Sequence, residues 1–146
     1  MFFVKSEAID ISAVGGWNEG IDESDLVSGA GSDLIDIYES ATNATVLTIS
    51  GCVDNNDNWR VDVKRTDGTW HGNFTFYVKR TSDGEGGGSI SGGLSYIGVT
   101  TTDTQFFIGA GNRNSINLQY KLTGMSINVS PTNYNTAITF TVVDVE

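Results

Sequence analysis

Carboxylates are abundant in this 146-residue chain, whereas the other side chains that usually carry chemistry are scarce. The sequence holds one cysteine, Cys52, and one histidine, His71, beside eighteen Asp and Glu residues. A zinc site needs several His and Cys ligands, and a nucleophile needs an adjacent base. Cys52 is therefore interpreted as a small buried strand residue and His71 as an exposed loop residue. Because no carboxylate pair is marked as buried either, the sequence predicts a protein that is not an enzyme.

Calcium is the metal that the acidic turns favour. The stretch "DNNDNW" places oxygen-bearing side chains at alternate positions from Asp54, as the start of an EF-hand loop does. The glycine and the final glutamate of that loop are replaced by other residues, which excludes an EF-hand. Two irregular oxygen-ligand sites stay open, one at Asp54 and Asp57 and one at Asp22 and Asp25. A solvated acidic turn is the alternative interpretation of both.

A carbohydrate platform is a further candidate site, because aromatic side chains stack on sugars. Trp59 shares a strand face with Val61 and Val63, which favours a place in the core. Trp70 stands next to a predicted turn and is the aromatic residue expected to be most exposed. Trp70 is therefore the candidate ligand-binding residue.

The charge distribution restricts the partners of the chain. The net charge is −10, and residues 1–57 carry all of it, with eleven carboxylates against one lysine. This balance argues against nucleic acid and acidic membrane surfaces as partners. No apolar run is long enough to insert into a membrane. The Lys-poor composition is similar to that of secreted surface proteins, so an extracellular or cell-surface location is expected, with any signal peptide already removed.

Alternation of apolar and polar residues with a period of two predicts strands over most of the chain. Five clear runs and two further candidates are separated by Gly, Asn and Asp clusters, at 45–50, 59–65, 73–80, 94–101, 104–109, 115–124 and 137–144. The sequence therefore predicts an all-β domain over residues 33–146, an antiparallel β-sandwich of about seven or more strands. A closed barrel is the alternative.

Two stretches repeat the motif V-K-R-T followed by Asp-Gly. They end at Asp67-Gly68 and Asp83-Gly84, and together they hold four of the eight basic residues. Asp-Gly is a strong turn signal, so each copy is interpreted as the end of a strand followed by a turn. A paired cationic ligand site and an old hairpin duplication are the alternatives.

The first 32 residues form a separate region in this interpretation. "EAIDISAV" alternates like a short strand, and an acidic, Gly-rich stretch follows it. Residues 1–32 are therefore predicted to be an N-terminal extension with a strand that pairs either within its own domain or with another copy.

On "EAIDISAV" and on "AITFTVVD" near the C-terminus, the chain resembles secreted pilin-like filament subunits of the donor-strand type. The resemblance implies an Ig-like or pilin-like sandwich with an extracellular structural role and no active site. It implies self-association into a homopolymer by β-strand addition, with Ile9, Ile11 and Ala13 as the inserted residues. The alternative function is a monomeric module that binds a carbohydrate or another surface ligand.

Overall fold

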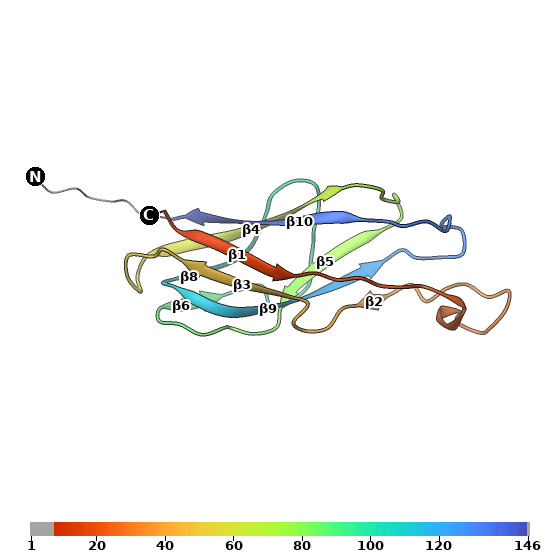
Figure 1. Cartoon of the computed structure of the whole chain (residues 1–146), viewed down its shortest axis with the longest axis horizontal. Coiled ribbons are helices and arrows are strands. Elements are labelled where there is room, and N and C mark those ends of the chain that lie inside the picture. Colours follow the sequence, from red (N-terminus) through yellow and green to blue (C-terminus); the bar gives the residue numbers. More distant parts are fainter. Residues whose placement is uncertain (1–7, 146) are drawn as a thin grey trace, which may run out of the picture.

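The computed structural model describes residues 8–145, which fold into two antiparallel β-sheets packed face to face (Figure 1). One short 3-10 helix, η1, spans Glu23–Asp25. The strands are β1 (Asp10–Gly15), β2 (Tyr38–Glu39), β3 (Thr45–Ser50), β4 (Asn58–Asp67), β5 (Thr75–Arg80), β6 (Ser89–Ser91), β7 (Ile97–Gly98), β8 (Thr104–Ala110), β9 (Arg113–Thr123) and β10 (Thr136–Asp144). The prediction of an all-β antiparallel sandwich is confirmed.

The order of the strands leaves two long strands at neighbouring edges. The first sheet has the order β1-β3-β9-β5-β7, with β2 also paired to β9, and the second has the order β10-β4-β8-β6. β1 and β10 are therefore edge strands of different sheets, and they lie beside each other along one side of the sandwich (Figure 1). The start of β1 lies next to the end of β10.

The core lies between the two sheets and consists of the inward residues of the predicted strands. Trp59, Val61 and Val63 all face inward on β4 and are at most 1% exposed. The indole nitrogen of Trp59 donates a hydrogen bond to the Gly111 carbonyl (2.9 Å), so even the polar atom of this side chain is satisfied. A side chain at Gly109 would collide with the Trp59 ring, which explains a glycine inside β8.

The predicted strand at 94–101 is much shorter than its pattern suggests, and residues 33–40 also pair over a short stretch. Of residues 94–101 only Ile97–Gly98 pair with β5, and of residues 33–40 only Tyr38–Glu39 pair with β9. Ile37 is 53% exposed, so the apolar alternation in the second segment does not mark a buried face. Residues 10–15, assigned from sequence to the N-terminal extension, form β1 and complete the edge of the first sheet.

The two V-K-R-T copies act as strand ends that secure their own turns. Arg65 forms an ion pair with Asp67, and Arg80 forms one with Asp83. In each copy the arginine Nε donates to a backbone carbonyl within segment 92–99, at 3.0 Å for Arg65 and 2.9 Å for Arg80. Because the guanidinium groups are engaged in this way, the structure favours the strand-end interpretation over a cationic ligand site.

Candidate functional site

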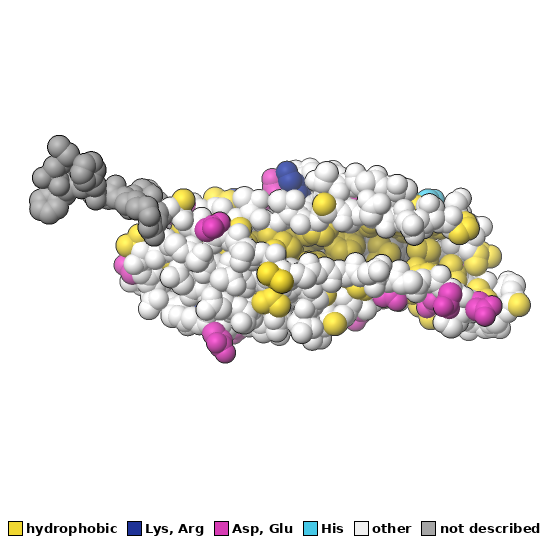
Figure 2. Space-filling model, viewed as in Figure 1, with side chains coloured by type: hydrophobic (Ala, Val, Ile, Leu, Met, Phe, Trp, Pro, Cys, Tyr) yellow, Lys and Arg dark blue, Asp and Glu magenta, His cyan; other side chains and the backbone are white. Residues whose placement is uncertain are grey.

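An apolar groove runs along the side of the sandwich where β1 and β10 lie (Figure 2). It encloses about 890 Å³. One wall is the end of β1 with the loop to Ile21, and the other is the first half of β10 with the preceding loop. The floor consists of core side chains, which are Thr45, Trp70, Phe74, Phe76, Tyr120 and Leu122.

The inward residues of β10 show that the groove is a gap in the sandwich. Ile138, Phe140 and Val142 alternate toward the core, as the sequence predicts, yet each stays only half-buried. The corresponding residues of β4, one strand further in, are fully buried. The difference arises because no strand covers the outer flank of β10 among residues 8–145.

Aromatic rings form a continuous floor. The ring centroids of Phe76 and Tyr120 are 5.3 Å apart, and those of Phe74 and Tyr134 are 5.0 Å apart. The Tyr120 hydroxyl is hydrogen-bonded to the Thr45 hydroxyl (2.6 Å). Burial raises the pKa of Tyr120, and this hydrogen bond opposes the rise. The Tyr120 phenol in the floor is therefore uncharged at neutral pH.

Trp70 lies in this groove rather than on an exposed turn. Its side chain is half-buried, and it packs edge-on against Phe74 at a centroid distance of 5.3 Å. The Arg65 guanidinium covers one ring face, 4.9 Å from the centroid. The sequence pattern did not show this position, because the ring is held by Phe74, directly before β5, and by Phe76 on β5. The Trp70 indole nitrogen is buried and has no acceptor among the described residues.

Both walls of the groove also present unpaired backbone. Among the described residues β1 pairs only with β3, from Asp10 opposite Ser50 to Gly15 opposite Thr45. β10 pairs only with β4, so the other flank of each strand has no ladder partner in this part of the chain. Long, unpaired edges of this kind are templates for another strand. The groove therefore offers apolar contacts and backbone hydrogen bonds together.

The three predicted donor residues lie on β1 or directly before it. Ile9 and Ile11 are half-buried and pack against the core of their own chain. Ala13 is exposed and lines the groove. Within a single chain these residues form the groove wall, and their insertion into another copy stays a prediction. Residues 1–7, the beginning of the predicted extension, lie outside the described residues.

The carboxylates proposed as calcium ligands serve local turns. Asp22 accepts a hydrogen bond from the Ser24 amide (2.8 Å), and Asp25 accepts one from the Asp22 amide (2.9 Å), which together cap η1. The Ser24 contact lowers the pKa of Asp22. Asp54 and Asp57 accept hydrogen bonds from amides of their own turn. Residues 8–145 contain no group of three acidic, His or Cys side chains placed to hold a metal.

Cys52 and His71 have separate surroundings in the structure. Cys52 follows β3, and burial, with smaller contributions from two nearby carboxylates, raises the pKa of its thiol. The ring of His71 packs against Phe74 and Tyr134, and its Nδ1 accepts a hydrogen bond from the Asn73 amide (3.2 Å). A raised thiol pKa disfavours the thiolate that a nucleophile requires.

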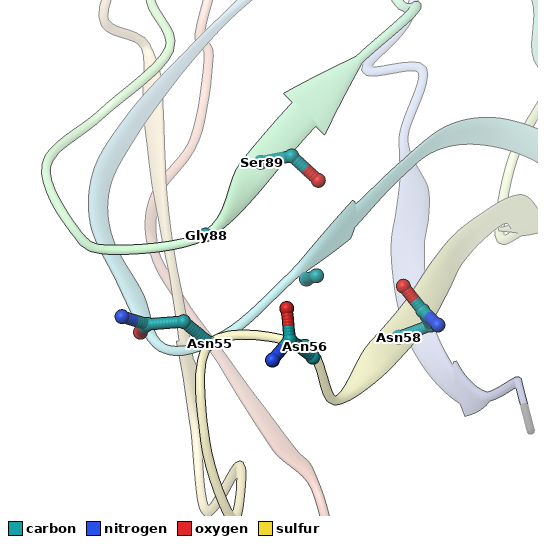
Figure 3. A pocket seen from close by; sticks show the side chains of 6 residues that line it. Asn55, Asn56, Asn58, Gly88 and Ser89 are labelled. Atoms are coloured by element: carbon teal, nitrogen blue, oxygen red, sulfur yellow. The ribbon is translucent and has the colours of Figure 1, made fainter.

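A second, smaller pocket lies at the other end of the sandwich, between the start of β4 and the start of β6 (Figure 3). It encloses about 280 Å³ and is lined by polar and small residues, which are Asn55, Asn56, Asn58, Gly88, Ser89 and Ala110. It contains neither a charged nor an aromatic side chain. The groove is therefore the better candidate site.

Comparisons with known proteins found no relative of this chain. No protein-family model, no curated protein and no solved structure matches the chain. Among residues 8–145 no helix has the length and apolarity required to cross a bilayer. The groove is therefore the feature of this chain that bears on function.

Proposed function

We propose that this chain is a non-enzymatic structural subunit of an extracellular filament or surface assembly, in which subunits are joined by β-strand addition. The observation that carries the proposal is the apolar groove between two unpaired edge strands. A small ligand would use the apolar floor but not the backbone of both edges. An inserted strand uses both, because its side chains alternate into the floor while its backbone pairs with the walls.

The donor that we propose is the N-terminal segment of a neighbouring copy, residues 1–7. It contains three consecutive apolar residues, Phe2, Phe3 and Val4. Seven extended residues span roughly 23 Å, and the nine residues of β10 (Thr136–Asp144) span about 30 Å, so the segment covers most of one wall. Because side chains alternate along a strand, Phe2 and Val4 share one face, and burying these two side chains contributes about 3–6 kcal/mol.

Insertion into the same chain is disfavoured by the geometry at the start of β1. The segment would have to reverse direction at once, because residue 10 already pairs with Ser50. The residues at this point are Ser6, Glu7 and Ala8, which lack the Gly, Asn or Asp that a tight hairpin turn prefers. Donation to another copy avoids this turn and creates a head-to-tail contact that repeats into a filament.

The test uses a matched pair of substitutions on β1. Ala13→Arg places a long charged side chain in the groove, whereas Ser12→Arg places the same side chain on the opposite strand face; both positions are exposed, so both variants should fold. Negative-stain electron microscopy should show filaments for the natural chain and for Ser12→Arg. It should show monodisperse particles for Ala13→Arg and for a chain that lacks residues 1–7.

Two outcomes would contradict the proposal. A natural chain that stays monodisperse with and without calcium would exclude the polymer. Filaments that survive both Ala13→Arg and the deletion would exclude the groove as the acceptor.

Two further outcomes would identify the contact. If filaments survive the deletion of residues 1–7 but not Ala13→Arg, then β1 itself, with Ile9, Ile11 and Ala13, is exchanged between copies. A filament that forms only with calcium would assign the acidic turns at Asp22–Asp25 or Asp54–Asp57 to the contact.

A monomeric carbohydrate-binding module is the second candidate, because Trp70 has an indole nitrogen without an acceptor in the described chain. One face of the Trp70 ring is already covered by Arg65, which reduces its use as a stacking platform. Under this function Trp70→Ala would abolish binding on a glycan array while the fold is kept. An array without hits, together with filaments in the microscope, would decide for the structural subunit.

A further inference from the structure

A second surface, on the outer face of the first sheet, gathers two lysines around two tyrosines. Tyr77 on β5 lies opposite Lys121 on β9, and Lys79 is two residues further along β5. Tyr96, from the segment before β7, packs against Tyr77 with their centroids 6.4 Å apart. We call Lys79, Lys121, Tyr77 and Tyr96 the lysine–tyrosine patch. It belongs to neither the groove nor the smaller pocket.

Both lysines approach the same ring. The ammonium group of Lys79 is 4.6 Å from the Tyr96 centroid, and that of Lys121 is 4.5 Å from it. Lys121 is also 4.5 Å from the Tyr77 centroid. The negative ring faces hold the two cations in place, although their like charges repel each other. A nearby anion would offset this repulsion.

No carboxylate forms an ion pair with the patch within the described part of the chain, although burial and the nearby Glu39 carboxylate raise the pKa of Tyr96. The arginines of this part are engaged, because three form ion pairs with aspartates on their own strand or turn and Arg113 is buried. Neither Lys79 nor Lys121 has a carboxylate within ion-pair distance among residues 8–145. Glu39 lies opposite Lys121 in the register of β2 and β9 without forming such a pair. The phenolic oxygen of Tyr96 is buried and has no hydrogen-bond partner in the same residues.

The chain itself supplies a complementary anionic surface. Between Lys5 and Arg60 there is no basic residue. The loops at the end of the molecule away from the C-terminus carry acidic side chains in Figure 2. We call the segment between β1 and β2 the acidic end; its carboxylates are Glu19, Asp22, Glu23, Asp25, Asp33 and Asp36. Several of these carboxylates are fixed by hydrogen bonds from backbone amides, as Asp33 and Asp36 are by Ile127 and Gly124. Fixed carboxylates lose little entropy when they meet a cation.

We propose that the lysine–tyrosine patch binds carboxylates at the acidic end of a second copy and so joins neighbouring subunits side by side. Each exposed ion pair contributes only about 0.2–1 kcal/mol, so one contact between two free subunits is weak. A filament repeats the contact along its length, and the repeats act together. In this respect the inference rests on the proposed function, because only a polymer turns a weak contact into a bundle.

The experiment compares variants of equal charge. Lys79→Gln with Lys121→Gln removes two positive charges from the patch, and Lys64→Glu makes the same net change on β4 of the other sheet. Each full-length chain is examined by negative-stain microscopy and sedimentation velocity at about 20 mM and about 500 mM NaCl, where the Debye lengths are roughly 20 Å and 4 Å.

We expect the natural chain and Lys64→Glu to form bundles at low salt that separate into single filaments at high salt. The double variant should form single filaments at both salt concentrations, with at least a tenfold loss of bundled mass. Two results would overturn the inference without contradicting the filament. One is an equal bundled mass for the double variant and the natural chain, and the other is a bundled mass that does not change with salt.

If no filaments form, the proposed function fails and the inference is judged on free subunits. Static light scattering at low salt should then show weaker attraction between free subunits, as a higher second virial coefficient, for the double variant than for the equally charged Lys64→Glu. Equal coefficients would overturn the inference. Retention of a soluble polyuronate by the natural chain but not by the double variant, without any association of subunits, would also overturn it, because the partner would then be an acidic polysaccharide.

Discussion

The two long sides of this sandwich handle their sheet edges in opposite ways. On one side the edge strands are short, two residues in β7 and three in β6. The loops on both sides of β6 are secured by Arg80 and Arg113. Their guanidinium groups donate to the carbonyls of Ser82, Asp83 and Gly87 before this strand and of Gly92 after it. On the other side β1 and β10 have six and nine residues and an open groove.

The difference in edge protection indicates which side of the sandwich is suited to binding a partner strand. Natural sheets protect their edges with short strands and covering loops, because long free edges recruit other strands. The closed side follows this rule and uses two buried arginines to do so. The open side departs from it over the whole length of β10, and it exposes aromatic side chains as well as backbone. The departure supports the proposal that another strand belongs there.

The largest expected effect comes from truncating the same side chain on the two sides. Phe107 on the closed side is 1% exposed, whereas Phe140 beside the groove is half-buried. Phe107→Ala should lower the free energy of unfolding by about 3–5 kcal/mol, and Phe140→Ala by roughly 1–2 kcal/mol, because less surface is lost from the interior. Urea denaturation of a monomeric background such as Ala13→Arg measures both values.

A synthetic peptide of residues 1–8 sharpens this comparison in the deletion background. Bound in the groove, it should increase the cost of Phe140→Ala and leave that of Phe107→Ala unchanged. Equal costs for the two substitutions without peptide would mean that β10 is already covered, and the contrast between the sides would fail.

The next effect concerns the arginine that secures the closed side. Arg80 is 2% exposed and pairs with the exposed Asp83, while the more exposed Arg60 pairs with Asp62. Arg80→Ala should cost about 2–4 kcal/mol, because it leaves buried carbonyls without donors. Arg60→Ala should cost less, because the Arg60 side chain is exposed and bonds no buried carbonyl. Thermal unfolding by circular dichroism gives both numbers, and a tolerated Arg80→Ala would show that the loop closes this side without it.

The smallest effect is a pH dependence from the floor of the groove. Burial raises the pKa of Tyr120 above its ordinary value of 10.0 in the folded chain. The stabilisation is therefore complete below pH 10 and is lost as the pH rises through the folded pKa. Tyr120→Phe should remove this part of the alkaline loss and cost about 1 kcal/mol at pH 7 through the lost hydrogen bond to Thr45. Identical alkaline unfolding of both chains would contradict the assignment.

Much of the fold could be predicted from the local alternation of apolar and polar residues. The period-2 runs identified β3, β4, β5, β8, β9 and β10, and they placed Trp59, Ile138 and Phe140 on inward faces. The pattern was wrong for most of 94–101, because apolar alternation there is not matched by a partner strand. It also placed Trp70 on an exposed turn, since the aromatic neighbours that bury it come from the next strand.

The sequence by itself determined the β-class, the strand faces, the Asp-Gly turns and the acidic first third, because each depends on near neighbours in the chain. Only the tertiary structure decided that β1 and β10 become adjacent edges of different sheets, and that Lys79, Lys121 and Tyr96 meet on one face. Both features come from pairings between distant segments, which the arrangement of the sheets selects and no local pattern encodes. The groove and the lysine–tyrosine patch are therefore properties of the fold rather than of any motif.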